Sequence, residues 1–396
     1  MDNLNDPFPA DVDVQSFPAQ YKDEGEDWLA LYNPNIQRRL DVRLEFQYQL
    51  HSVVCCAAIS PSAVFIAVGG RGSTEMYAVN TGCRAYFFAD PAADGSDDVW
   101  IRSLCFHPKT ILLATGADDN MIRIWDFVRE TILVKLDAHV GSVYSLAFSS
   151  DGNLLASCGE DQKVKIWEWN TQGTPCKVLV VHDAEPTDEQ YFTSVAFTPD
   201  SRHLAVSSMD SVVRIWDVAT TTLITTIGGH TNSVYSISFA HDGSRLVSSS
   251  FDGSVKLWDT SALITQPESA DSGSGTSSAP GLVGQGGTGV SGESGEVGEM
   301  SDMYLRRCRL LINFLGHRDY VLCNKVTDNG RWVISGSKDS CIRFWDARTG
   351  VVQCELQSHG DSVFCLDVCP RRNGGYLITG GADAFMKLWR FRERAA

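Results

Sequence analysis

Short apolar runs alternate with compact polar turns along most of this chain. The runs "SVYSLAFS" (142–149) and "SVYSISFA" (233–240) place apolar residues on both faces, as strands do when they pack between two neighbouring sheets. Tight turns such as "SSDGN" and "AHDGS" follow them, where Asp and Gly tolerate the positive φ of a hairpin. A second strand and then a third, which ends in tryptophan, complete the pattern ("LLASCG" and "VKIW"). It predicts antiparallel units of short strands.

A fixed set of polar residues returns with each unit. Aspartate stands six residues before tryptophan in six copies: Asp119/Trp125, Asp161/Trp167, Asp210/Trp216, Asp252/Trp258, Asp339/Trp345 and Asp383/Trp389. A histidine precedes that aspartate at His139, His230, His317 and His359, and a hydroxyl residue stands four before it at Thr115, Ser157, Ser248, Ser335 and Thr379. Neighbouring tryptophans lie 42, 49, 42, 87 and 44 residues apart. A period of roughly 40 to 45 residues with this ending predicts the blades of a WD-repeat propeller.

The repeated histidine, hydroxyl and aspartate also raise the question of a catalytic triad. A catalytic site occurs once, because its groups converge on one substrate, whereas this set occurs complete in four copies. We interpret it as a buried relay in which the carboxylate, the imidazole, the hydroxyl and the indole N–H are linked by hydrogen bonds. Each such bond contributes about 1 kcal/mol net, and losing one partner costs more. Because no phosphate-binding loop or metal-ligand spacing is present, we expect no enzyme activity, no cofactor and no metal site.

The sequence predicts an all-β, seven-bladed WD-repeat β-propeller. Six copies are clear, and residues 52–79 form a degenerate first copy in which Tyr77 replaces the tryptophan. Asp97 and Asp188 stand in the histidine position of blades two and four, and Val206 stands in the hydroxyl position of blade four. We expect packing, more than the relay, to hold these three blades.

The two ends of the propeller are predicted to meet. The chain stops seven residues after Trp389, so blade seven lacks an outer strand, and an open edge there would favour aggregation. Residues 41–50 ("DVRLEFQYQL") have strand composition and are expected to close the ring. Residues 1–40 are interpreted as an acidic, partly disordered leader with an ordered patch at 27–40, and residues 41–396 as the propeller.

Blade five contains a long insertion at residues 260–303. From Asp271 to Glu299 it has 16 glycine or serine residues among 29 and no lysine or arginine, so it cannot bury enough surface to become ordered. It separates the third strand of the blade from the predicted outer strand at 307–315. We expect the insertion to be disordered and to project from the face opposite the histidine-bearing loops.

Charge and composition narrow the classes of partner. The chain has 33 basic and 49 acidic residues, a net charge of −16, and such a surface repels phosphate backbones, so direct binding of nucleic acid is not expected. No run of about 18 apolar residues exists, which predicts no membrane span. The 12 cysteines form no C-x-x-C pair and follow no secretory leader, which indicates reduced thiols in a nuclear or cytoplasmic protein.

One rim of the propeller is the predicted binding site. Positions three and five after the histidine, with the residue before each aspartate, should face this rim near the channel mouth. They gather aromatic and arginine side chains, which carry much of the binding energy at protein interfaces. The candidate partner-binding residues are Trp100, Arg102, Tyr144, Tyr191, Met209, Tyr235, Phe251, Tyr320 and Phe364. The alternative is that tyrosines such as Tyr144 and Tyr235 only line the channel and pack against their neighbours.

Two stretches are more specific than the WD pattern: "LYNPNIQRRLDVRLEFQYQLHSVVCCAAIS" (31–60) and "GHRDYVL" (316–322). They resemble the C-terminal propeller of the fungal Tup-type general transcriptional corepressors, and the resemblance covers about residues 28–392. It implies a nuclear interaction platform that does not touch DNA. It also implies recruitment by DNA-binding repressor proteins and action with histone tails, histone deacetylase and Mediator subunits. Tyr144 matches a rim tyrosine of the family that is implicated in repressor binding.

Members of that family also have an N-terminal helical segment that forms a tetramer and binds a tetratricopeptide-repeat adaptor. No heptad pattern precedes the propeller here, so we expect a fragment or a short paralogue that does not bind the adaptor in this way. The alternative function is a WD-repeat scaffold of another complex, either a substrate receptor of a ubiquitin ligase or a subunit of a general transcription factor. A nuclear location is expected, with a cytoplasmic pool as the alternative.

Overall fold

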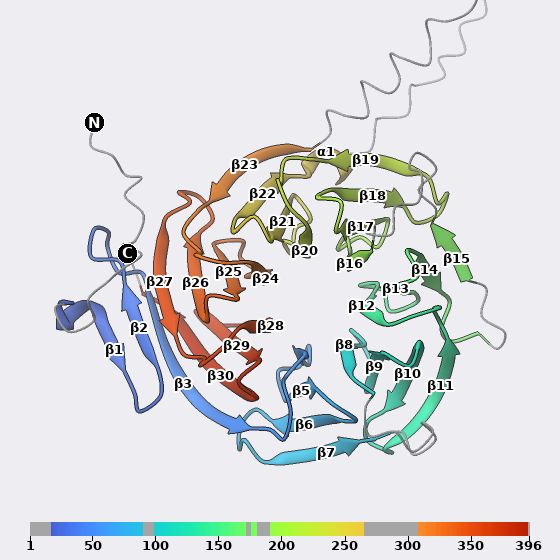
Figure 1. Cartoon of the computed structure of the whole chain (residues 1–396), viewed down its shortest axis with the longest axis horizontal. Coiled ribbons are helices and arrows are strands. Elements are labelled where there is room, and N and C mark those ends of the chain that lie inside the picture. The colour runs from blue at the N-terminus through green and yellow to red at the C-terminus, as the bar shows by residue number, and fades with distance from the viewer. Residues whose placement is uncertain (1–16, 90–98, 172–175, 180–190, 265–307, 395–396) are drawn as a thin grey trace, which may run out of the picture.

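Seven antiparallel sheets surround a central channel in the computed structural model (Figure 1). The structure describes residues 17–89, 99–171, 176–179, 191–264 and 308–394. Within each sheet the first strand lines the channel and the later strands follow outward. The predicted all-β, seven-bladed propeller is confirmed.

Blades one to four each use four consecutive strands. Blade one contains β4 (Cys56–Ile59), β5 (Phe65–Gly69), β6 (Thr74–Ala78) and β7 (Arg84–Phe88). Blade two contains β8 (Ile101–Phe106), β9 (Leu112–Ala117), β10 (Met121–Asp126) and β11 (Thr131–Asp137). Blade three contains β12 (Val143–Phe148), β13 (Leu155–Gly159), β14 (Val164–Trp167) and β15 (Cys176–Leu179). Blade four contains β16 (Phe192–Phe197), β17 (His203–Ser208), β18 (Val213–Asp217) and β19 (Leu223–Ile227).

Blades five to seven include the long insertion and strands from the N-terminal part of the chain. Blade five contains β20 (Val234–Phe239), β21 (Arg245–Ser250), β22 (Val255–Asp259) and β23 (Arg309–Phe314). Blade six contains β24 (Val321–Val326), β25 (Trp332–Ser337), β26 (Cys341–Asp346) and β27 (Val352–Gln357), extended by β2 (Leu29–Tyr32) and β1 (Lys22–Glu24). Blade seven contains β28 (Val363–Arg371), β29 (Gly374–Gly381), β30 (Phe385–Glu393) and β3 (Leu40–Gln49). The short helices are η1 (Ala19–Tyr21) and α1 (Ser261–Ile264).

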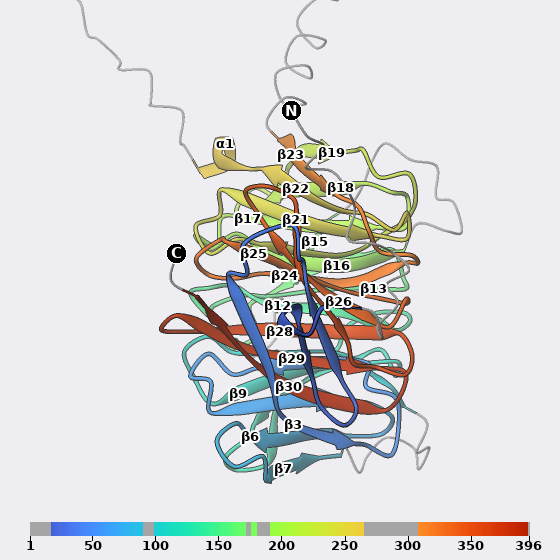
Figure 2. The same cartoon turned by 90° about the vertical axis from the view of Figure 1, so that its left-hand side faces the viewer.

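The N-terminal strand closes the ring, as predicted. Strand β3 pairs antiparallel with β30, from Leu40 opposite Glu393 to Gln49 opposite Phe385 (Figure 2). Leu40 and Val42 are fully buried in one cluster with Trp389. The closing strand therefore contributes core packing as well as backbone hydrogen bonds, which leaves no open edge on β30.

A short hairpin ahead of the closing strand extends blade six, which the sequence does not foretell. Strand β2 pairs with β27, and β1 pairs with β2. The Tyr32 hydroxyl accepts a hydrogen bond from the Val42 backbone N–H at 2.9 Å, and the Trp28 ring lies 5.7 Å from the Trp389 ring. Blade six is consequently a six-stranded sheet whose hairpin also packs on blade seven.

The insertion in blade five lies between β22 and β23, where the sequence places it. Its first residues form α1, and residues 265–307 lie outside the described residues. Its predicted disorder and the face from which it projects therefore stay predictions.

The predicted relay is present in four blades. In blade three the His139 Nδ1–H donates to Asp161 Oδ1 at 2.7 Å, and His139 Nε2 lies 2.7 Å from Ser157 Oγ. The same hydroxyl accepts the Trp167 Nε1–H at 2.9 Å. Equivalent contacts of 2.7–3.1 Å surround the histidines of blades five, six and seven: His230, His317 and His359. These groups are buried structural partners, which supports the interpretation against a triad.

Blades two and four contain an ion pair in addition to packing. The Arg123 guanidinium binds Asp119, with Nη1 3.0 Å from Oδ1, and Arg214 Nη2 lies 2.5 Å from Asp210 Oδ2. In blade two Trp125 Nε1–H still donates to the threonine hydroxyl at 3.0 Å. The expectation that packing, more than the relay, holds these blades did not include this ion pair, in which the arginine four residues after the aspartate binds the carboxylate. Asp97 and Asp188 lie outside the described residues.

Candidate functional site

A β-bulge in the first strand of blades two to seven determines which side chains reach the channel mouth. The pairing of the first and second strands shifts register at one residue in each blade. A bulge leaves that residue unpaired and turns its side chain away from the alternating pattern. The bulged residues are Arg102, Tyr144, Thr193, Tyr235, Leu322 and Phe364. These are the positions five residues after the histidine position, so the spacing used for the prediction has a structural cause.

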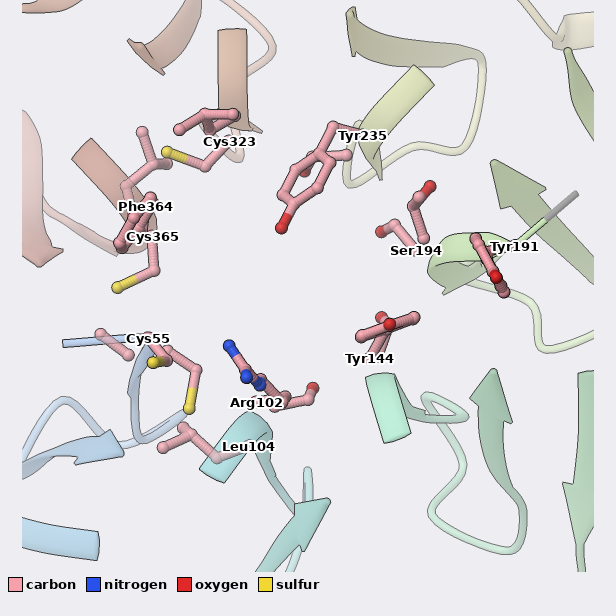
Figure 3. A pocket seen from close by; sticks show the side chains of 18 of the residues that line it. Cys55, Arg102, Leu104, Tyr144, Tyr191, Ser194, Tyr235, Cys323, Phe364 and Cys365 are labelled. Atoms are coloured by element: carbon pink, nitrogen blue, oxygen red, sulfur yellow. The ribbon is translucent and has the colours of Figure 1, made fainter. Parts of the chain in front are cut away.

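Six of the nine predicted residues line one cavity of about 400 Å³ at the channel mouth. They are Arg102, Tyr144, Tyr191, Met209, Tyr235 and Phe364. Figure 3 shows five of them, Arg102, Tyr144, Tyr191, Tyr235 and Phe364, projecting from different blades around the opening. The structure thus brings these six side chains together, although their role in binding stays a prediction.

The other three predicted residues lie beside this cavity. Phe251 stacks between Tyr235 and Tyr320, with ring centroids 5.2 and 4.5 Å away. Lys338 lies 5.0 Å from the Tyr320 ring. Tyr235 and Tyr320 each retain 39% of their accessible surface. The stack therefore forms an aromatic ledge, made of Tyr235, Phe251 and Tyr320, that runs from the channel mouth onto blades five and six.

Trp100 lies at the edge of blade two. Its backbone forms a β-bridge with Arg71 of blade one, and the Arg102 guanidinium lies 5.7 Å from its ring. Arg102 is also held by Asp118 in a bidentate contact, at 2.8 and 2.7 Å. This hydrogen bonding raises the pKa of Arg102, so the guanidinium is a fixed positive charge at the channel mouth.

Tyr144 and Tyr235 of the channel mouth are neutral hydrogen-bonding groups at physiological pH. Burial, followed by the nearby Glu160 carboxylate, raises the pKa of Tyr144, and burial raises the pKa of Tyr235. Each hydroxyl can therefore donate as well as accept a hydrogen bond. Aromatic faces with a polar tip suit recognition of another polypeptide.

Several cysteines line the same cavity and were not among the predicted site residues. Cys55, Cys323 and Cys365 contribute thiols to the channel wall (Figure 3). Cys55 directly follows Val54, as the bulged Tyr144 follows Val143, so it stands in the corresponding position of blade one and could have been found from that pattern. Burial raises the pKa of all three thiols, which keeps them protonated and poor nucleophiles.

The described residues contain no group of three or more histidine, cysteine, aspartate or glutamate side chains that could hold a metal ion. In the part of the chain that the structure describes, no helix is long and apolar enough to cross a membrane. The chemistry of the channel mouth is that of a contact surface: aromatic rings, one fixed guanidinium and neutral hydroxyls.

Comparison with known proteins agrees with the repeat pattern. The family model "WD domain, G-beta repeat" matches residues 93–126, 130–168, 173–217, 221–259, 308–346 and 350–390. These matches cover more than half of the chain. The chain belongs to the WD-repeat family. Blade one is outside the matched residues, in keeping with its missing relay.

Three relatives illustrate the range of similar proteins. The chain is 35% identical over 387 residues to "Transcriptional repressor rco-1" of Neurospora crassa, which covers 96% of this chain and 57% of that protein. It is 29% identical over 448 residues to "General transcriptional corepressor TUP1" of Saccharomyces cerevisiae, covering 98% and 58%. It is 32% identical over 296 residues to "Nuclear distribution protein nudF 1" of Talaromyces marneffei, covering 68% and 63%.

The resemblance to the fungal Tup-type corepressors is confirmed by the first two of these WD-repeat relatives. The chain spans somewhat less than three fifths of the length of each of them. For this chain, the activities and partners of those longer proteins are therefore treated as proposals.

Proposed function

We propose that this WD-repeat protein is a non-enzymatic transcriptional corepressor scaffold whose channel mouth binds segments of DNA-bound repressor proteins. The observation that carries the proposal is the ring of bulged side chains, which is continued outward by the aromatic ledge. Its six members come from six different blades, so a peptide at the channel mouth contacts many parts of the ring at once. The names of the rco-1 and TUP1 relatives support repression as the process.

Histone tails are a second proposed class of ligand for the same rim. The net charge of −16 favours basic segments over nucleic acid, and neutral tyrosines with open aromatic faces suit cationic side chains. The scaffold acts in the nucleus under this proposal, and histone deacetylase and Mediator subunits are recruited as further proteins rather than bound as cofactors.

The test is a pull-down from nuclear extract with the wild-type chain and a Tyr144→Ala/Tyr235→Ala variant. Both side chains line the channel mouth, and neither is fully buried, so the fold is expected to survive. DNA-binding repressors should be recovered with the wild-type chain and lost with the variant. A matched control, Leu133→Ala/Val178→Ala, removes two exposed apolar side chains from outer strands and should retain the repressors.

The same experiment separates the alternative scaffold functions. Recovery of a cullin complex or of a general transcription factor would replace the corepressor proposal. Equal recovery of repressors with both variants would place the binding surface away from the channel mouth.

A further inference from the structure

Blade one differs from the relay blades at the positions where the relay would stand. Val54 packs on Gly380 of the preceding blade, just as Val143 of blade three packs on Gly116 of blade two. Counting back from these valines gives Leu50, but the strand register, with Gln49 opposite Phe385 as Asp137 is opposite Met121, aligns His51 with His139. His51 is exposed, and the apolar Leu50 beside it lines the space next to the second strand.

The second strand of blade one shows a matching replacement. Val68 pairs with Glu75 across β5 and β6, as Ser157 pairs with Lys165 across β13 and β14. Valine therefore replaces the hydroxyl, and glutamate replaces the lysine. The buried hydroxyl that links the relay in blade three is therefore absent from blade one.

A cavity of about 640 Å³ lies at this position in blade one. Leu50 and Val68 line its apolar part, and Val68 is only 1% exposed. Arg71, Arg84 and Phe87 line the wall on the solvent side, where the Phe87 side chain keeps 47% of its accessible surface. The loop residues that line the cavity belong to the rim that carries the channel mouth, since Arg71 is bridged to Trp100.

The charges at this cavity favour an anionic ligand. Among the described residues that line the cavity, Glu75 is the one acidic residue, and its carboxylate is already engaged by the Tyr77 hydroxyl at 2.8 Å and by Arg84 Nη1 at 3.2 Å. The Arg84 side chain is 56% exposed and lies over the Phe87 ring at 5.6 Å. A guanidinium has five N–H donors and takes carboxylate or phosphate oxygens in pairs, so Arg84 has donors for a second acid.

We propose that the cavity of blade one is a second peptide-binding site, which takes an acidic side chain next to an apolar one. The carboxylate or phosphate of the ligand binds Arg84, and the apolar neighbour enters the space above Leu50 and Val68. This site is separate from the channel mouth, and its existence does not depend on the corepressor function.

The test follows the methyl NMR signals of Leu50 and Val68 in the 396-residue chain. Three capped tripeptides are titrated to roughly 10 mM, a concentration suited to weak complexes. One carries glutamate between two leucines, one carries phosphoserine there, and one carries glutamine. Arg84→Gln is the test variant, and Arg129→Gln, at another exposed arginine paired with an acid, is the matched control.

The acidic peptides should shift both methyl signals, and the glutamine peptide should not. Arg84→Gln should weaken the binding roughly fivefold, the upper range for an exposed charge pair, whereas Arg129→Gln should leave it unchanged. A shift with only one acidic peptide supports the site and identifies its ligand as a carboxylate or a phosphate. Equal shifts with the glutamine peptide, unchanged binding by Arg84→Gln, or no shift at the highest concentration would overturn the proposal. Signals from methyl groups elsewhere report whether each variant is folded.

Discussion

Blade one and blade three have their strands in the same register, but different interactions hold them. Tyr77 stands opposite Ile66 in blade one, as Trp167 stands opposite Leu155 in blade three. Blade three adds the buried relay around His139, whereas blade one relies on a valine-on-glycine contact and on the closing strand. The blade shape therefore comes from strand pairing and inter-blade packing, and the relay adds stability to a shape that already exists.

Removing the closing strand β3 beside blade one should have the largest effect on stability. A chain that begins at residue 50 loses Leu40 and Val42, and two fully buried side chains alone contribute about 3–6 kcal/mol. It also loses the stacking of Tyr48 on Tyr77, at 5.2 Å. Thermal unfolding should show a large drop in melting temperature.

A chain that begins at residue 25 is the control for this deletion. Of the described residues it lacks 17–24, which include η1 and β1 and of which none is buried, so it should melt close to the full-length protein. Equal melting temperatures for the two shortened chains would show that β3 does not hold the ring.

The second prediction compares the relay histidine of blade three, His139, with the apolar Leu50 of blade one. His139→Ala leaves the Asp161 carboxylate without its partner in a buried setting, and we expect a loss of about 3 kcal/mol in the free energy of unfolding. Leu50→Ala truncates a partly exposed side chain beside a cavity and should cost clearly less. Urea unfolding of both variants measures the difference. A larger loss at Leu50 would mean that the relay contributes little.

The third prediction tests the contact that both blades share. A Cβ added at Gly116 would lie 2.7 Å from Val143 Cγ1, and one added at Gly380 would lie 2.4 Å from Val54 Cγ1. Gly116→Ala and Gly380→Ala should therefore each destabilise the protein by about 1–3 kcal/mol, the usual cost of overpacking. Calorimetry on both variants checks this. Gly228→Ala, where a Cβ would meet no atom within 4 Å, is the control.

The smallest predicted effect concerns pH. Burial acts to raise the pKa of Asp339, but its hydrogen bond from His317 holds that pKa well below the ordinary value, and burial lowers the pKa of His317. The unfolded chain therefore takes up protons on both groups before the folded chain does, so stability falls as pH drops below about 6.5 and falls further below about 4.

The free energy of unfolding measured between pH 7 and pH 4 should show this decline. Asp339→Asn should be less stable at neutral pH and should decline less steeply between pH 5 and pH 4, where the unfolded chain would protonate this carboxylate. The Leu50→Ala variant removes no titratable group and should keep the wild-type slope. An unchanged slope in Asp339→Asn would contradict the linkage.

The repeats made most of the ring predictable, because six blades encode their own turns and tryptophan and four of them the full relay. The channel-mouth residues followed from a spacing rule, yet the reason for that rule, a bulge in each first strand, depends on pairing that the sequence does not display. Phe251 and Tyr320 were found by position, but their stacking with Tyr235 depends on how neighbouring blades are arranged in space.

Three features could not be foreseen, for related physical reasons. The hairpin of β1 and β2 pairs with residues more than 300 positions away, and its strands are too short for a clear periodic pattern. The Arg123 and Arg214 ion pairs are visible only once the missing histidine leaves the carboxylate without a partner. The cavity of blade one arises from Leu50 and Val68, whose apolar side chains look like ordinary strand residues in the sequence.

Closure by β3 has a consequence for the order in which the protein forms. A ribosome makes β3 well before its partner β30, so the strand waits for roughly 340 residues to be made before it can pair. Such a long separation makes ring closure the late and slow step of folding. Until then the apolar faces of β3 and of the last completed blade stay exposed in the nascent chain. Chaperones would therefore bind most strongly during this interval.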